Sequence, residues 1–287
     1  MKRIISLLII LTALTAGADT HYPIPDIRWS AELQKAAESG DIAAQRNLGI
    51  CLLYELGIKA DENEAFPWFK KAADKGDPEA QTYVGDFYYG EFGDLFEDKE
   101  SEAYKWYKKA ADRNFPYGIY LLAECYNLGD GVEEDEAKYL ELLRKAADMR
   151  CSEAAYDLAF EYKDGKHLPQ DISKYYEYMT VAAEEGIPMA MINMGIAYYK
   201  GEGVTRDYNR AFRFLNNSVK WIESGDHGYG WMADGMRMLS ACYRYGRGTE
   251  VNKELANKYL EIASYIDKND REAIREALRS IGREVKE

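Results

Sequence analysis

The chain has 287 residues, with 50 acidic and 37 basic side chains, which gives a net charge of −13 at neutral pH. This excess of negative charge argues against nucleic acid and anionic membrane surfaces as partners, because both are bound by clustered Lys and Arg. With 47% hydrophobic residues the chain can build a sizeable core, and its length alone would suggest about two domains.

The first eighteen residues have the pattern of a secretory signal peptide. The basic residues Lys2 and Arg3 precede an apolar run at 4–14, and the small residues at 16–18 fit a cleavage site. That run is shorter than a membrane span, and no later segment approaches the ~20 apolar residues that a span needs. We expect cleavage after residue 18, which removes two positive charges and leaves a net charge of −15. The sequence predicts a periplasmic protein without membrane insertion.

An Ala-Ala doublet recurs from residue 31 onward at a nearly fixed spacing. It stands at 36–37, 72–73, 110–111, 146–147 and 182–183, with degenerate copies at 218–219 and 262–263. The steps of 36, 38, 36, 36, 36 and 44 residues are typical of stacked helical repeats. A second signature follows most doublets, a helix with a small residue that runs into a Gly-x-Gly turn. Its copies at 48–58, 84–94, 122–132, 158–168, 194–204 and 239–249 indicate six units.

The fifth unit shows how each repeat is expected to fold. Pro188 suits the first turn of a helix, and Gly201 and Gly203 suit its end. Asp207 is placed to cap a second helix. Apolar side chains follow Pro188 at spacings of four residues: Ala190, Met194 and Tyr198. Because neither helix can bury its apolar face alone, the units must stack on one another.

This pattern resembles the Sel1-like repeat family, which is related to the tetratricopeptide repeats, and the resemblance covers roughly residues 31–263. The resemblance implies an all-α fold, an α-solenoid in which pairs of antiparallel helices stack into a right-handed superhelix. We predict about six such helix-turn-helix repeats over residues 31–269, after a signal peptide at 1–18 and an N-terminal extension at 19–30. The stretch 270–287, with arginines every four residues, is predicted to be a C-terminal capping helix.

The four cysteines are predicted to be free. Cys51, Cys125 and Cys242 occupy the same position in their units, and two repeats separate the first two. Helices packed 8–10 Å apart would place these two roughly 20 Å from each other, whereas a disulfide needs Cα atoms within about 7 Å. Cys151 lies at the turn into the fourth unit and has no obvious partner. In the cysteine-rich branch of the family, paired cysteines staple consecutive units, and this chain departs from that pattern.

No catalytic constellation is found in the sequence. The three histidines, His21, His167 and His227, are isolated, and no His-Glu-x-x-His, Walker A, Gly-x-Ser-x-Gly or Ser-x-x-Lys stretch occurs. The Gly-x-Gly elements recur in repeat phase between two helices, which indicates a loop role, since a phosphate cradle would follow a strand. We expect a protein that is not an enzyme and binds neither cofactor nor metal.

The resemblance to tetratricopeptide geometry implies that one face of the first helices lines a concave binding surface. Its positions, which we call the first-helix row, are Arg46, Ile50, Leu53, Thr82, Asp86, Tyr89, Tyr120, Glu124, Asn127, Tyr156, Phe160, Lys163, Ile192, Ile196, Tyr199, Arg237, Ala241 and Arg244. The middle of the row is aromatic where a solvated face would be charged, and aromatic side chains are typical of interface centres. The alternative is that these rings are buried as core.

The last unit is longer than the others by about eight residues, centred on 224–231. His227, Tyr229 and Trp231 give this expansion the composition of a contact loop, although a tolerated surface insertion is the commoner explanation.

The sequence therefore predicts an exported, monomeric protein that binds another protein. The acidity of the chain favours a partner with a basic surface, although it also fits a role in solubility. By resemblance, an adaptor, a regulator or a toxin-neutralising immunity protein are the expected roles. The alternative is an enzyme that binds or hydrolyses cell-wall material or β-lactams, as in the cysteine-rich branch, and the missing cysteine pattern weakens it.

Overall fold

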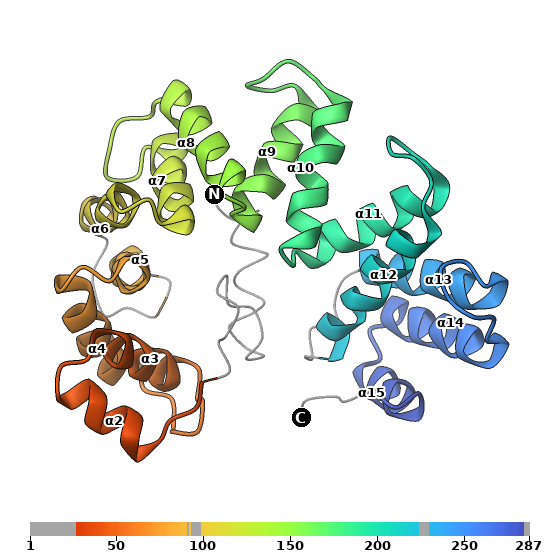
Figure 1. The fold of residues 1–287 in the computed structure, drawn as a ribbon, viewed down its shortest axis with the longest axis horizontal. Helices are drawn as coiled ribbons and strands as arrows, with labels where there is room; N and C mark the ends of the chain where they lie inside the picture. The colour runs from red at the N-terminus through yellow and green to blue at the C-terminus, as the bar shows by residue number, and fades with distance from the viewer. Residues whose placement is uncertain (1–26, 91, 93–98, 224–229, 284–287) are drawn as a thin grey trace. The chain divides into compact units, whose positions relative to one another are not determined.

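The computed structural model describes residues 27–90, 92, 99–223 and 230–283. Over these residues the chain forms fourteen α-helices and no strands, and the helices follow one another in pairs (Figure 1). The predicted all-α repeat solenoid is therefore confirmed. The bounds are α2 Ala31–Glu38, α3 Ile42–Leu53, α4 Glu62–Asp74, α5 Pro78–Tyr89, α6 Glu100–Asp112, α7 Pro116–Leu128, α8 Glu136–Asp148, α9 Ser152–Asp164, α10 Ile172–Glu184, α11 Pro188–Lys200, α12 Tyr208–Glu223, α13 Gly230–Tyr245, α14 Lys253–Asp267 and α15 Arg271–Ser280.

The helices group into two compact units, divided within α9 after Ala154. The N-terminal unit contains α2 to α8, and the C-terminal unit contains α10 to α15 with most of α9. In each repeat the first helix carries an odd number from α3 to α13, and the second helix carries the even number that follows.

Local chemistry sets where the helices begin and end. Most N-termini are capped by an Asp or Asn side chain that accepts a hydrogen bond from the backbone N–H three residues on, as predicted for Asp207. These caps are Asp41, Asp61, Asp77, Asp135, Asp171, Asp207, Asn252 and Asp270. Each contributes about 1 kcal/mol of helix stability. Helices α5, α7 and α11 begin with proline and end at a left-handed glycine, which confirms the expectation for Pro188 and Gly201.

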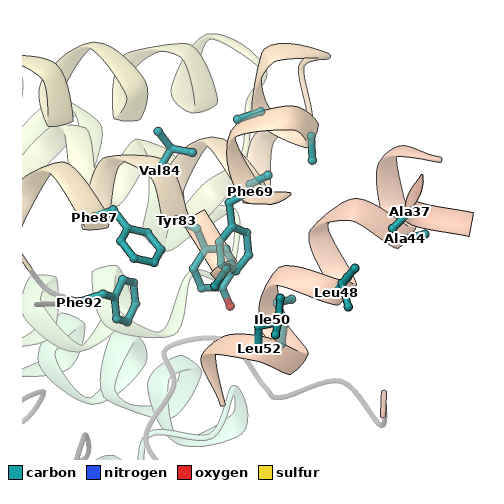
Figure 2. Packing of buried hydrophobic residues seen from close by; sticks show 14 of the residues in the cluster. Ala37, Ala44, Leu48, Ile50, Leu52, Phe69, Tyr83, Val84, Phe87 and Phe92 are labelled. Atoms are coloured by element: carbon teal, nitrogen blue, oxygen red, sulfur yellow. The ribbon is translucent and has the colours of Figure 1, made fainter. Parts of the chain in front are cut away.

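Aromatic stacking dominates the core of the N-terminal unit. The Phe69 ring stacks on Tyr83 with 4.3 Å between centroids, and Phe87 and Phe92 lie beside them, 4.9 Å apart (Figure 2). Phe69 reaches this position because Gly49 has no side chain, since a Cβ there would lie 2.9 Å from the ring. The small residue of the first helix thus admits the large residue of the second helix at close range.

The core of the C-terminal unit is mainly aliphatic and extends onto the last helix. Leu215, Met236 and Ile262 are fully buried together with Leu278 of α15. Helix α15 therefore covers the apolar side of the last repeat. This is the packing expected of a terminal capping helix, because an uncovered last repeat would expose its apolar face.

The Gly-x-Gly turns dock their own repeats on the preceding ones. A Cβ at Gly131 would lie 2.5 Å from the carbonyl oxygen of Glu100, and one at Gly248 would lie 2.0 Å from that of Tyr208. Both glycines also have positive φ, 70° and 76°. The loop role expected for these turns is confirmed, and the docking fixes where the middle residue of each turn points.

Helix α2 is a lone second helix. Gln45 of α3 donates through Nε2 to the carbonyl oxygen of Ala37 at 3.0 Å, just as Gln81 of α5 donates to that of Ala73 at 3.2 Å. Helix α2 therefore stands to α3 as α4 stands to α5. The first Ala-Ala doublet belongs to this half repeat, which lies ahead of the six complete repeats.

All four cysteines are free and buried, as predicted. Burial raises the pKa of the Cys51 and Cys242 thiols to about 11. Among the helices of the described residues, none combines the length and the apolar character that crossing a membrane requires.

Candidate protein-binding surface

Arg46 of the first-helix row joins two neighbouring repeats. Its guanidinium lies 2.8 Å from Asp77 and 3.1 Å from Glu79, at the start of α5. Burial raises the pKa of Glu79, and the charge of Arg46 partly offsets that rise. The side chain of Arg46 is 23% exposed, so its main visible role is an ion pair between first helices.

Five further members of the row in the N-terminal unit are buried: Ile50, Thr82, Asp86, Tyr120 and Glu124. Asp86, Tyr120 and Glu124 are exposed by 7%, 8% and 6%, and the Asp86 carboxylate accepts a hydrogen bond from the Tyr107 hydroxyl at 2.8 Å. These side chains offer little surface to a partner. For them the alternative holds, in which members of the row are buried as core.

Tyr89 is half-buried and meets a turn of the next repeat. Its hydroxyl donates to Oδ2 of Asp130 at 2.6 Å, and Asp130 is the middle residue of the turn between Gly129 and Gly131. The first-helix row and the Gly-x-Gly turns are therefore joined at this point.

Tyr156 and Phe160 form an aromatic pair on α9 in the C-terminal unit. Their ring centroids are 4.9 Å apart, both side chains are half-buried, and Phe160 also meets Tyr175 of α10 edge-on at 6.1 Å. The Tyr156 hydroxyl donates to the sulfur of Met189 at 2.8 Å, which ties α9 to α11. The exposed Lys163 places its ammonium 5.1 Å from the Phe160 ring. The row thus presents a fixed, partly exposed aromatic surface here.

Tyr199 of α11 is the next aromatic member of the row. It meets Tyr208 of α12 edge-on at 5.4 Å, and its hydroxyl accepts a hydrogen bond from Arg247 at 2.5 Å. Burial raises the pKa of Tyr199, and the neighbouring Arg247 opposes that rise. This ring and the Tyr156–Phe160 pair lie in the same unit.

The two arginines of the row on α13 bind polar groups of the last repeat. Arg237 forms ion pairs with Asp234 and Asp267, and Arg244 donates to Asn257 at 2.9 Å. Exposed ion pairs of this kind contribute at most about 1 kcal/mol to stability.

The predicted contact loop is only partly placed. Trp231 lies at the start of α13 and packs in part against the core of the C-terminal unit. His227 and Tyr229 lie outside the described residues, so their predicted contact role stays a prediction.

The sequence reading overlooked the middle residues of the Gly-x-Gly turns. Arg247 and Asp130 both contact a tyrosine of the row, and the sequence signal for them was their constant place between the two glycines of the turn. Across the part of the chain that the structure describes, no group of three or more His, Cys, Asp or Glu side chains could hold a metal ion.

Together, the paired helices, the docking turns and the aromatic row define an all-α repeat protein of the kind that presents a surface along its first helices. Six segments match the model of the Sel1 repeat, so the chain belongs to the Sel1 repeat family. The matched residues are 42–77, 78–115, 116–151, 152–187, 188–218 and 233–267.

Two solved structures share the fold. A Sel1 repeat protein from Oxalobacter formigenes is 24% identical with a TM-score of 0.61, over 96% of this chain and 76% of that one. The protein c5321, a protective antigen present in uropathogenic Escherichia coli strains, is 26% identical with a TM-score of 0.57, over 89% of this chain and 53% of that one.

One curated relative matches a short stretch. The chitin synthase regulator SKT5 of Saccharomyces cerevisiae is 47% identical over 58 residues, which is 19% of this chain and 8% of the yeast protein. The chain thus spans less than a tenth of the length of that relative.

Proposed function

We propose that this chain is an exported, periplasmic protein that binds another protein through the first-helix row of its C-terminal unit. The observation that carries the proposal is the Tyr156–Phe160 pair, because two adjacent rings are held in place by Tyr175 and Met189 yet stay partly exposed. Rigid, half-exposed aromatic side chains are typical of the energetic centres of interfaces.

A regulatory or protective role agrees with the names of two similar proteins. One relative is a regulator and one structural neighbour is a protective antigen, and neither name describes chemistry on a small molecule. We therefore propose an adaptor, a regulator or an immunity protein that acts by occupying a surface of its partner. The net charge of −13 favours approach to a partner with a basic surface.

Affinity capture tests the binding surface. The chain without residues 1–18 is immobilised and exposed to a periplasmic extract of the source organism, and retained proteins are identified by mass spectrometry. The Tyr156→Ala/Phe160→Ala double variant should lose the partner that the parent chain retains. The control, Ile172→Ala/Leu260→Ala, removes side chains that are 47% and 41% exposed on second helices, and it should retain the partner.

Two results would contradict this assignment. One is equal retention of the partner by the double variant and the control. The other is a melting point of the double variant lowered by many degrees, because truncating a buried aromatic costs about 3–5 kcal/mol and would show that the rings are core.

Export has its own test. When the full chain is expressed with its first eighteen residues in a Gram-negative host, the protein in the periplasmic fraction should begin at Asp19. A chain that stays in the cytoplasm with residues 1–18 intact would contradict export.

A further inference from the structure

Two Gly-x-Gly turns contact the first-helix row in the same way, but their middle residues have opposite charges. In the N-terminal unit Asp130 accepts a hydrogen bond from Tyr89 of α5, and in the C-terminal unit Arg247 donates one to Tyr199 of α11. In both cases a tyrosine near the end of a first helix contacts the middle residue of the turn in the next repeat. The repeat therefore provides one geometry in which the charge of the middle residue can be varied.

The backbone around Arg247 is held rigidly. Gly246 and Gly248 have φ of 66° and 76°, and Gly248 packs directly on the carbonyl group of Tyr208. A turn docked in this way fixes the position and direction of the Cα–Cβ bond of Arg247. The residue is therefore presented at a fixed place beside Tyr199.

Three tyrosine rings surround the guanidinium of Arg247. Its Cζ lies 4.9 Å from the centroid of Tyr199, 5.1 Å from that of Tyr208 and 5.3 Å from that of Tyr245. The rings come from α11, α12 and α13, and Tyr245 is 62% exposed. Stacked aromatic rings orient a guanidinium without using its N–H groups.

Most hydrogen-bond donors of Arg247 are left for a ligand. A guanidinium carries five N–H groups, and the Tyr199 hydroxyl takes one of them. Among the described residues no carboxylate lies within ion-pair distance of Arg247. Nearby on α13, Arg244 is likewise bonded to a neutral side chain, Asn257. This end of the row is thus locally cationic in a chain of net charge −13.

We propose that Arg247 binds a carboxylate group of an acidic segment in the protein partner, with Tyr199 and Tyr245 packing against that segment. The inference rests on the proposed protein-binding function and adds the chemistry of the contact. Oriented guanidinium groups match carboxylates because they can offer two parallel N–H groups. A partner with a basic surface overall can still carry an acidic segment at this contact. Long-range attraction depends on the charge of the whole surface, whereas the contact depends only on the groups that touch.

Peptide titration tests this contact. A fluorescein-labelled peptide, Glu-Glu-Tyr-Glu-Glu-Tyr-Glu-Glu, is titrated with the chain without residues 1–18 and followed by fluorescence anisotropy at about 150 mM salt, where long-range forces are screened. We expect saturable binding, at least about tenfold weaker binding of the analogue with Gln in place of Glu, and about tenfold weaker binding by Arg247→Gln. Because the protein is acidic, non-specific attraction cannot produce this preference.

Arg213 provides a matched control. It is an exposed arginine of the same unit whose guanidinium lies 5.2 Å from the Phe214 ring, so Arg213→Gln removes the same charge from a similar aromatic contact. Its affinity for the glutamate peptide should stay within about twofold of the parent value. Arg247→Lys keeps the charge and loses the planar donors, so an intermediate affinity is expected. Should Arg247→Gln fold poorly, Tyr245→Ala at an exposed ring gives a second variant with the same expected direction.

Several outcomes would overturn the inference. They are no binding of the glutamate peptide, equal losses for Arg247→Gln and Arg213→Gln, or tighter Arg247-dependent binding of an oligothymidylate, which would assign the site to phosphate. These failures are distinct from failure of the proposed function, because partner capture that depends on Tyr156 and Phe160 would still stand.

Discussion

The second glycine of each Gly-x-Gly turn meets two structural demands that a larger residue would not. The backbone needs positive φ, and the space that a Cβ would fill is taken by the preceding repeat. Gly248 shows both, with φ of 76° and the Tyr208 carbonyl oxygen 2.0 Å from the site of a Cβ. Gly201 at the start of its turn shows mainly the first, since its φ is 78° and its nearest neighbour is a side chain 3.3 Å away.

Substitution by alanine separates these two demands. Gly201→Ala should lower the free energy of unfolding by the cost of a left-handed alanine, about 1–2 kcal/mol. Gly248→Ala adds a clash with backbone and should cost clearly more. Chemical denaturation of the two variants measures the difference, and equal losses would show that the turn does not dock as described.

The burial of the thiols predicts how their reactivity and the stability of the protein change with pH. Burial raises the pKa of Cys51 and Cys242 to about 11 from an unfolded value of about 9, so the reactive thiolate is scarce in the folded protein at pH 8. Iodoacetamide should label the native chain slowly and label all four thiols after denaturation. Since the unfolded chain loses these protons first, stability should fall as the pH rises from 9 toward 11. A disulfide found by mass spectrometry, or rapid native labelling, would contradict this burial.

At the scale of helices, the parts set by local chemistry could be predicted and those set by neighbours could not. The spacing of apolar residues, Pro188 and Gly201 define helix α11 without knowledge of the rest of the chain. Exposure within the first-helix row depends instead on the next first helix, about 30 residues away. Arg46 is covered by Asp77, and Tyr156 contacts Met189. For the same reason Arg247 was not predicted, because its contact with Tyr199 of the preceding repeat is not evident from the local sequence.

Helix α15 is predicted to stabilise the last repeat. Leu278 is fully buried in the core of the C-terminal unit, so Leu278→Ala should lower the free energy of unfolding by about 2–5 kcal/mol. Leu260→Ala on α14 is the control, because Leu260 is 41% exposed and its loss should cost well under 1 kcal/mol. Thermal or urea unfolding measures both variants. Equal, small effects would mean that α15 does not act as a cap.

At the scale of the molecule, binding energy and long-range charge come from different sources. Under the proposed function, the net charge of −13 would govern the approach of a partner, whereas the half-exposed rings of Tyr156, Phe160 and Tyr199 in the C-terminal unit would govern its dissociation. The proposed function requires that the row, and not the second helices, meets the partner.

Site-specific photo-crosslinking tests that claim most directly. A photoreactive phenylalanine analogue is placed in turn at Phe160 and Tyr199 of the row and at Ile172 and Leu260 on second helices, and each protein is irradiated with the captured partner. Crosslinks are expected from the two row positions, and none from the two exposed positions on α10 and α14. Crosslinks from Ile172 or Leu260, with none from Phe160 or Tyr199, would contradict that claim.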